Sequence, residues 1–334
     1  MAVSALEAKL KRFGIDRYMM LLILTVVLAT VLPARGEFAK VLSQVTYWAV
    51  ALLFFVYGAK LATSTIVSGL TNWKLQLGCL LCTYALFPLI ALGLAPVAGL
   101  YLPAAFAIGI LYIGCLPSTV QSSIAFTSVS GGNVAGAVCA ASISNLLGVA
   151  LAPLLFTLLI PSSSGLHFGT EAIWKICMQI LFPFIAGQLC RPLIGKWINE
   201  HKLVTTVVDR GSILLIVYSA FSAGVVNGIW HVVDVPHMVG LFLLVCLMLA
   251  LGMIISILSS RVVGMNRPDQ IALFYCGSTK SLATGLPMAG ILFAGQEVAM
   301  IVLPLMLFHL TQLFVCAIIS QRLAARHAAA VAVA

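Results

Sequence analysis

The chain is too apolar to be a soluble protein, since 62% of its 334 residues are hydrophobic and only 8% are charged. A soluble domain of this size cannot cover its surface with so few charges, so the composition excludes that class. The net charge of +9 does not indicate nucleic-acid binding, because the distribution of the basic residues reports membrane topology instead. We therefore expect an all-α integral membrane protein that has the lipid bilayer as a partner.

Apolar segments of roughly twenty residues, the length that a helix needs to cross a bilayer, recur along the chain. The first, at 18–33, follows a basic start and could be a signal peptide, but it lacks a small-x-small cleavage site and many more segments follow it. We interpret it as the first transmembrane span, after an amphipathic cytoplasmic segment at 1–16. In chain order the ten predicted spans cover residues 17–33, 44–62, 75–95, 102–129, 133–160, 171–195, 206–228, 236–259, 268–294 and 296–320.

Basic residues between the predicted spans fall mostly on one side of the membrane. If the N-terminus is cytoplasmic, Arg35, Lys40 and Lys175 lie outside, Lys280 lies within a span, and the remaining lysines and arginines lie inside. An excess of lysine and arginine marks the cytoplasmic side. The pattern therefore predicts ten spans with both termini in the cytoplasm.

The two halves of the sequence resemble each other at a nearly constant offset. Tyr57 and Tyr218 are 161 residues apart, and so are Cys115 and Cys276. A repeat of five spans must enter the membrane in the opposite orientation the second time, as in many secondary transporters. We therefore predict two inverted five-helix repeats, at 17–160 and 171–320.

Two predicted spans carry residues that interrupt a transmembrane helix. In span 102–129 the helix-breaking residue is Pro117, and in span 268–294 the corresponding residues are Gly277, Gly285 and Pro287. Proline removes a backbone donor, and glycine and proline are poor residues for a helix interior. Irregular backbone at membrane depth is tolerated only where protein or a water-filled cavity covers it. Two such interruptions at matching repeat positions predict a transporter site where they cross.

Polar side chains gather at both predicted interruptions. The free N–H groups of one half-helix suit anionic groups, and the free carbonyls of another suit cations. Asn145, His309 and Gln312 on flanking spans could also face the crossing, although a lone intramembrane histidine is more often structural. The candidate binding residues are Ser118, Thr119, Gln121, Ser122, Ser123, Ser278, Thr279, Lys280, Ser281 and, in support, His309.

Lys280 is the charged residue that we place near the middle of a span, whereas no Asp or Glu lies there. An ionisable group at that depth indicates a functional site. Its ammonium could occupy the space of a bound cation, carry a proton during the cycle, or pair with an anionic substrate. Asp209 and Asp269 fall near cytoplasmic span ends, where solvated or helix-capping roles are expected.

Other polar residues in the spans have simpler interpretations. Gln179 and Gln188 are expected to form hydrogen bonds between helices. Cys79 and Cys82 form a C-x-x-C inside a span with no second pair nearby, so we interpret them as packing residues and predict no metal site and no resident cofactor.

Three stretches resemble the bile acid:sodium symporter family. They are Pro-Ser-Thr-Val-Gln-Ser-Ser-Ile-Ala-Phe-Thr-Ser at 117–128, Gly-Asn-Val-Ala at 132–135 and Cys-Gly-Ser-Thr-Lys-Ser-Leu-Ala at 276–283. The first and third resemble in particular the bacterial branch related to the seventh vertebrate member of the family. The resemblance implies a bacterial inner membrane location, a panel domain of spans 1, 2, 6 and 7, and a core domain of spans 3–5 and 8–10. Spans 4 and 9 would cross in the core, with sodium sites beside the crossing.

The sequence departs from the family at the sodium ligands that the resemblance implies. The glutamate ligand of the family's ninth span falls on or near Cys276, and its following glutamine falls near Lys280. The serine–asparagine pair of the fourth span falls around Gln121, Ser122 and Ser123. The coupling ion could be sodium, as the resemblance implies, or a proton, because these ligands differ.

These features predict a secondary active transporter of a small organic anion, a class that includes amphipathic anions, with alternating access between panel and core. One alternative is a membrane regulator that acts through a protein partner without transport, since the vertebrate branch is linked to calcium regulation. Another is an intramembrane enzyme that uses Cys115, Cys276 or His309. No motif pairs a nucleophile with a base, so we expect no enzymatic activity.

Overall fold

A computed structural model describes residues 17–60, 72–160, 174, 177–228, 233–293 and 298–333, with side chains described from residue 20 to residue 325. The expected cytoplasmic segment at 1–16 lies outside the described residues. The described part of the chain is helical and contains no strand. The prediction of an all-α protein is therefore confirmed for these residues.

Two π-helical turns interrupt the regular helices of the described chain, at Cys82–Leu86 and Cys177–Leu181. The helices of the first half are α2 (Arg17–Val31), α3 (Gly36–Lys60), α5 (Trp73–Leu81), α6 (Phe87–Tyr101), α7 (Ala104–Cys115), α8 (Gln121–Val129) and α9 (Val134–Leu159). Those of the second half are α11 (Phe182–Glu200), α12 (Lys202–Val226), α14 (Val235–Val262), α15 (Arg267–Ser278), α16 (Leu282–Leu292) and α17 (Val298–Val333).

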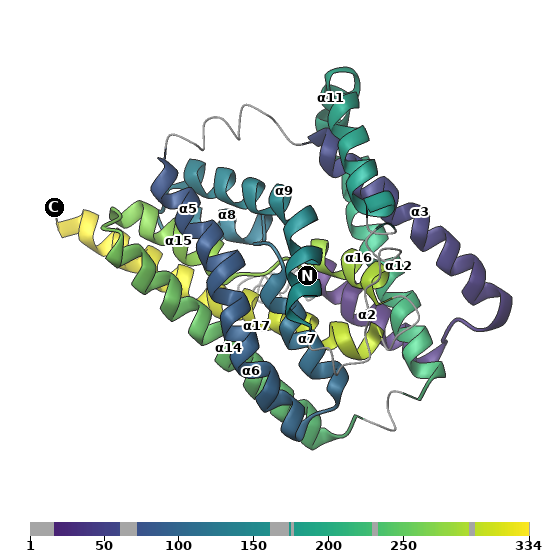
Figure 1. Ribbon diagram of the computed structural model, residues 1–334. Helices are drawn as coiled ribbons and strands as arrows, with labels where there is room; N and C mark the ends of the chain where they lie inside the picture. The colour runs from purple at the N-terminus through teal and green to yellow at the C-terminus, as the bar shows by residue number, and fades with distance from the viewer. Residues whose placement is uncertain are drawn as a thin grey trace, which may run out of the picture.

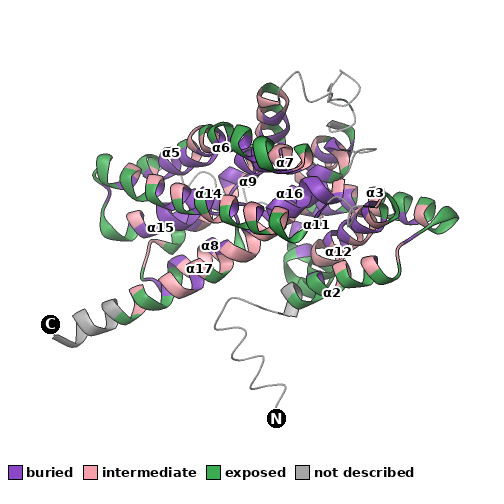
Figure 2. Ribbon diagram, turned by 90° about the horizontal axis from the view of Figure 1, so that it is seen from below, coloured by how far each residue is buried: buried purple, intermediate pink, exposed green. Residues whose placement is uncertain are grey.

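Six helical segments among the described residues are long and apolar enough to cross a membrane, and two shorter apolar helices, Met20–Val31 and Ala104–Cys115, accompany them. The six are Gly36–Lys60, Trp73–Tyr101, Val134–Leu159, Lys202–Val226, Val235–Val262 and Val298–Ala325. Large apolar side chains such as Leu158, Leu189 and Leu243 are exposed on the outward faces, as Figure 2 shows for the helix surfaces in general. Such faces suit contact with lipid, and the protein is a multi-pass membrane protein. The count of ten spans and the inverted repeat stay predictions.

The helices form two groups, which can be followed in Figure 1. In the four-helix group, α3 packs against α11 and α12, and α2 packs against α12. The larger group contains α5–α9 and α14–α17, in which α7 packs against α6, α9 and α17. Contacts of α12 with α16 and α17 join the two groups. The interface between the groups therefore runs beside α16 and α17.

The close approach of α3 and α11 depends on glycine. A Cβ atom at Gly58 would lie 2.0 Å from the carbonyl oxygen of Phe184, and one at Gly187 would lie 1.9 Å from that of Phe55. No side chain fits at such distances, so each glycine lets the backbone of the other helix pass beside it. Within the four-helix group, α3 and α11 are consequently in direct backbone contact.

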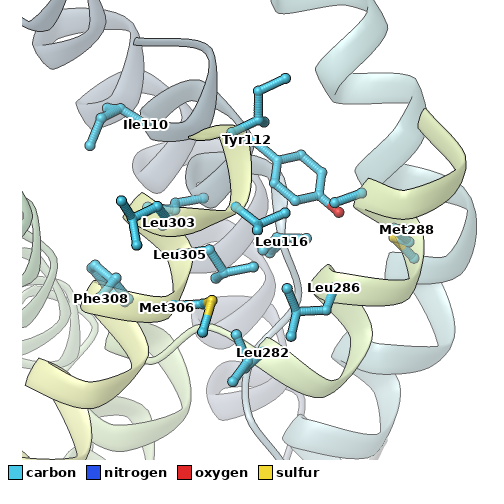
Figure 3. Packing of buried hydrophobic residues seen from close by; sticks show 14 of the residues in the cluster. Ile110, Tyr112, Leu116, Leu282, Leu286, Met288, Leu303, Leu305, Met306 and Phe308 are labelled. Carbon is cyan, nitrogen blue, oxygen red and sulfur yellow. The ribbon is translucent and has the colours of Figure 1, made fainter. Parts of the chain in front are cut away.

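Apolar side chains surround the irregular backbone that separates α7 from α8 (Figure 3). Tyr112 of α7 is fully buried and donates a hydrogen bond to the carbonyl oxygen of Gly285, 2.6 Å away. A Cβ atom at Gly285 would lie 2.6 Å from side-chain atoms of Leu116 and Leu305, so a larger residue here would make these two leucine side chains shift. This packing fixes α7 against α16 beside the candidate site.

Candidate functional site

The first interruption lies between α7, which ends at Cys115, and α8, which begins at Gln121. Residues 116–119 are irregular and residue 120 forms a bend. Pro117 lies within this segment and cannot donate a backbone hydrogen bond. Val120, the cap residue of α8, provides no side-chain acceptor to the first turn of the helix. The N–H groups of that turn therefore have no partner within their own helix.

The second interruption covers residues 279–281, between α15 and α16. Gly277 lies in the last turn of α15, whereas Gly285 and Pro287 lie inside α16, so the interruption falls between these residues rather than at any of them. Its position follows from local hydrogen bonds. The Ser281 side chain accepts a bond from the N–H of Thr284 at 3.2 Å, which caps the start of α16.

The two interruptions contact each other directly. The Ser281 N–H donates to the carbonyl oxygen of Pro117 at 2.8 Å. The hydroxyls of Thr119 and Thr279 are 2.9 Å apart, and the hydroxyl of Ser118 is 3.5 Å from that of Thr279. The sequence-predicted residues Ser118, Thr119, Thr279 and Ser281 thus come together from segments about 160 residues apart.

Lys280 is fully buried between the interruptions, with an exposed fraction of 0%. Its ammonium donates to the carbonyl oxygens of Gly114 at 3.0 Å, Leu116 at 2.8 Å and Thr83 at 2.9 Å. It also lies 4.3 Å from the ring centroid of Phe87. All three donors of the ammonium are therefore used on backbone carbonyls, two of them at the carboxyl end of α7. A positive charge at a helix carboxyl end is favourable.

Gln312 on α17 holds the backbone of Lys280 with both ends of its amide. The Lys280 N–H donates to Oε1 at 2.8 Å, and Nε2 donates to the Lys280 carbonyl oxygen at 2.8 Å. Nε2 also lies 2.9 Å from Nδ1 of His309, one turn earlier on the same helix. Residues three apart on a helix share a face, which explains this contact.

Other predicted residues complete the contacts around the crossing. The Ser122 hydroxyl donates to that of Thr119 at 2.8 Å. Ser123 donates to the carbonyl oxygen of Thr119 in the first interruption, and Ser278 donates to that of Phe274 within α15. Asn145 on α9 donates to the carbonyl oxygen of Ser118 at 2.7 Å. It also accepts from the Thr284 hydroxyl at 2.9 Å. Asn145 therefore links α9 to the first interruption and to the first turn of α16.

A cavity of about 520 Å³ lies between the four-helix group and the crossing. Five of the ten predicted binding residues line it, namely Thr119, Gln121, Ser122, Ser281 and His309. The other five, Ser118, Ser123, Ser278, Thr279 and Lys280, lie behind the lining in the packed contacts of the crossing. The four-helix group lines the cavity with Phe54, Tyr57, Lys60, Phe184, Asp209, Arg210 and Ile213.

Sequence reasoning missed two basic lining residues, Lys60 on α3 and Arg210 on α12. Their position at predicted cytoplasmic span ends was interpreted as topology alone. Asp209 also lines the cavity, and it accepts a hydrogen bond from the Tyr57 hydroxyl at 2.5 Å. The sequence contains one signal for Lys60. It lies three residues after Tyr57, so the two side chains share one face of the helix.

The secondary predictions can be compared with the structure as well. Gln179 donates to the carbonyl oxygen of Tyr47 at 3.3 Å, which is the hydrogen bond between helices that was expected. Of the solvated and helix-capping roles expected for Asp269, the structure excludes the solvated one, because the residue is buried and accepts from Asn72 and Asn133 at 3.0 and 2.7 Å. Its place in the first turn of α15 lets it join α5, α9 and α15.

The cysteines that an enzyme would have to use are away from the cavity. Cys115 and Cys276 are fully buried, and their thiols lie near the carbonyl oxygens of Leu111 and Ala137. Cys79, Cys82 and Cys276 belong to one small apolar cluster. These positions fit the interpretation that the thiols are packing residues.

Comparison with known proteins agrees with the family resemblance of the sequence. Over residues 16–325 the chain matches the SBF-like CPA transporter family. It is 48% identical to "Uncharacterized protein PA2026" of Pseudomonas aeruginosa, over 94% of this chain and 95% of that protein. It is 44% identical to "Putative symporter YfeH" of Escherichia coli over 92% of each chain. It is also 32% identical to "Sodium/bile acid cotransporter 7" of Rattus norvegicus over 80% of each chain. The protein therefore belongs to the SBF-like CPA transporter family, a group of bile acid:sodium symporter type.

Proposed function

We propose that this protein is a secondary active transporter of a small amphipathic organic anion, which binds in the cavity between the four-helix group and the crossed interruptions. The observation that carries the proposal is the composition of the cavity wall. One side presents the first turns of two half-helices, and the facing side presents two basic side chains. Anions are stabilised at helix amino ends and beside basic groups.

The charge of the lining favours an anion. Lys60 and Arg210 together outweigh the single carboxylate, Asp209. Gln121 and Ser122 belong to the first turn of α8, and Leu282 and Ala283 belong to the first turn of α16. Ser281 already accepts from the N–H of Thr284 in α16, and we propose that the remaining N–H groups of these turns bind an anionic group of the substrate.

The apolar part of the lining favours a substrate with a hydrophobic body. Aromatic and aliphatic side chains from both helix groups share the cavity with the polar residues; they are Phe54, Val120, Phe126, Leu146, Val149, Phe184, Ile213, Leu282 and Leu313. Ligand sites that are mostly apolar, with a few polar groups, suit amphipathic molecules. Several relatives are named sodium/bile acid cotransporter 7, which supports testing bile acids among the candidate anions.

We propose further that the ammonium of Lys280 takes the place of a coupling cation. It occupies the carbonyl oxygens at the carboxyl end of α7, which could otherwise coordinate a cation. With that position filled, transport would not depend on sodium there. The protein would then need another coupling ion, such as a proton.

For the cycle, we propose that the four-helix group acts as a panel and the larger group as a core, in a fold of ten spans and two inverted repeats. The cavity would be open to the cytoplasm in this state, because it is lined by Lys60, Asp209 and Arg210 at predicted cytoplasmic span ends. Both termini would lie in the cytoplasm, and the membrane would be the bacterial inner membrane. Rocking of one group against the other would expose the cavity to the opposite side.

A thermal-shift screen of the purified protein against decanoate, cholate and neutral decanol would test the anion site. Ligands that bind the folded state raise the unfolding temperature. We expect shifts with the two carboxylates and a smaller one with decanol. Uptake of labelled decanoate and cholate into proteoliposomes would then test transport.

Two matched variants would locate the anion. Arg210→Gln removes a basic group from the cavity, and we expect it to weaken carboxylate binding about tenfold. Lys196→Gln removes an exposed basic group of α11 outside the cavity, and we expect no change. Equal loss in both variants would contradict the proposed site. Binding without any uptake would contradict transport and favour a regulator.

A further inference from the structure

The hydrogen bonds of Gln312 determine which nitrogen of His309 carries its proton. A backbone N–H can only donate, so the amide atom that faces the N–H of Lys280 must be the oxygen, Oε1. The other end of the amide is therefore the nitrogen, which donates to the Lys280 carbonyl oxygen. The same nitrogen lies 2.9 Å from Nδ1 of His309 and can only donate to it. Nδ1 must then be an acceptor, and the neutral imidazole carries its proton on Nε2.

A second proton on His309 is incompatible with this arrangement. In the imidazolium both nitrogens are donors, so an N–H on Nδ1 would face the N–H of Gln312 at hydrogen-bond distance. Either the imidazole or the amide must then turn away. Because the amide also holds the N–H and carbonyl of Lys280, protonation of His309 acts on the second interruption through a single intervening side chain.

His309 is also in contact with the space that the substrate would occupy, since it lines the cavity, whereas Lys280 does not. The charged and titratable groups that line the cavity with it come from two elements, Tyr57 and Lys60 on α3 and Asp209 and Arg210 on α12. The lining residues contributed by α8, α9, α11 and α16 include no ionisable side chain. Lys280 itself is fully buried, with its ammonium bonded to three carbonyls.

These charges determine whether a proton on His309 strengthens or weakens binding of the anion. A proton on His309 adds a positive charge to a cavity that already contains Lys60 and Arg210 against Asp209 alone. A bound anion offsets that charge, so the anion and the proton favour each other's binding. The reciprocal effect is a proton taken up when the anion binds.

We propose that His309 binds the proton that accompanies the anion, and that Gln312 transmits its protonation to the interruption at Lys280. This inference deepens the proposed function and rests on it, because it assigns the coupling ion and the residue that binds it. Lys280 is then a fixed charge and does not itself carry the transported proton. The coupled step is binding of one proton to Nδ1 of a neutral imidazole, with no covalent change in the substrate.

The tautomer can be tested without any substrate. Histidine labelled with nitrogen-15 would be followed by NMR in lipid nanodiscs at pH 8, and the His309 signals assigned by their absence from His309→Asn. Asparagine places an oxygen near the position of Nδ1, so it can accept from Gln312 but cannot bind a proton. We expect an unprotonated Nδ1 and a protonated Nε2. A neutral imidazole that is protonated on Nδ1 at pH 8 would overturn the inference.

Proton uptake on anion binding tests the coupling itself. Decanoate or cholate, adjusted to the same pH, would be added to wild-type protein in weakly buffered solution with a pH indicator. We expect wild type to take up protons and to bind either probe up to about tenfold more weakly per unit rise in pH. His309→Asn should bind both probes with no proton uptake and a flat pH profile. His201→Asn, at an exposed histidine between α11 and α12, is the matched control and should behave as wild type.

The outcomes separate the two proposals. Equal proton uptake in wild type and His309→Asn, with both proteins binding the probes, would overturn the role of His309 and leave the anion transporter standing. A wild type that binds the probes without taking up protons would do the same. Binding of neither probe to wild type would overturn the proposed anion site and this inference together.

Discussion

The two interruptions differ in what they offer to each other. The first, at residues 116–120, ends α7 with carbonyls that α7 itself cannot pair and starts α8 without a side-chain cap. The second, at 279–281, brings a lysine whose ammonium pairs two of those carbonyls. The first interruption therefore leaves carbonyl oxygens without a partner in their own helix, and the second supplies the ammonium that pairs them. Two broken helices therefore do not have to be chemically alike to pack against each other.

The carboxyl end of α7 differs in the same way from the amino ends of α8 and α16. The carboxyl end of α7 is occupied by Lys280, and the backbone of Lys280 is itself occupied by Gln312. The first turns of α8 and α16 contribute lining residues to the cavity. The carboxyl end of α7 is thus paired within the chain by a positive charge, whereas the amino ends of α8 and α16 border the cavity.

Removing the lysine should have the largest effect on stability. Lys280→Met leaves three buried carbonyls without their donor, so we expect the free energy of unfolding to fall by about 3 kcal/mol or more. Unfolding of the purified protein in detergent would measure this. Lys40→Met, at an exposed ion pair with Glu37, is the control and should change stability by less than about 0.5 kcal/mol. A Lys280→Met protein as stable as wild type would show that the carbonyls do not depend on the ammonium.

Loss of the Gln312 amide, which bonds the backbone of Lys280, should have the next largest effect on stability. Gln312→Leu removes the partners of the Lys280 N–H and carbonyl, and we expect a loss of about 2 kcal/mol. Gln121→Leu removes an amide that is exposed in the cavity and should have little effect on stability. Both variants would be measured by the same unfolding assay. Similar losses of unfolding free energy in the two would mean that the bonds of Gln312 to the Lys280 backbone do not stabilise the protein.

The hydroxyl contact between the interruptions should have the smallest effect. Thr279→Val keeps the shape of the side chain and removes its bonds to the Thr119 hydroxyl and the Tyr275 carbonyl, so we expect a loss of about 1 kcal/mol. Thr25→Val, which removes an exposed hydrogen bond from the Thr25 hydroxyl to the Leu21 carbonyl oxygen within α2, is the control. An unchanged melting curve for Thr279→Val would mean that only the backbone hydrogen bond and Lys280 stabilise the contact between the interruptions.

Local sequence could indicate the class of fold and where the helices are irregular. Apolar segments long enough to span a bilayer predicted an all-α membrane protein, and the described helices and the family match confirm that class. Proline at 117 and glycines at 277 and 285 drew attention to the two segments that the structure shows as interrupted. These are local properties of the chain, and local sequence carries them.

Local sequence could not show which way a side chain points. Lys280 was expected to replace a cation, carry a proton or meet the substrate, and only the tertiary contacts with Gly114 and Leu116 show that it faces carbonyls. Arg210 was assigned to topology, because its approach to α8 and α16 depends on how the helix groups pack. The contact of His309 with Gln312 follows helical spacing, but the use of Gln312 by Lys280 spans 32 residues and could not be foreseen. Binding roles for the predicted residues stay predictions.

The role of Lys280 as a built-in cation is tested most directly by the effect of sodium on unfolding. The apparent unfolding temperature of the wild-type protein would be measured in sodium chloride and in choline chloride at equal ionic strength, over a range of concentrations. A ligand of the folded state raises that temperature in a saturable way. We predict identical curves in the two salts. A saturable rise that is specific to sodium would contradict the account.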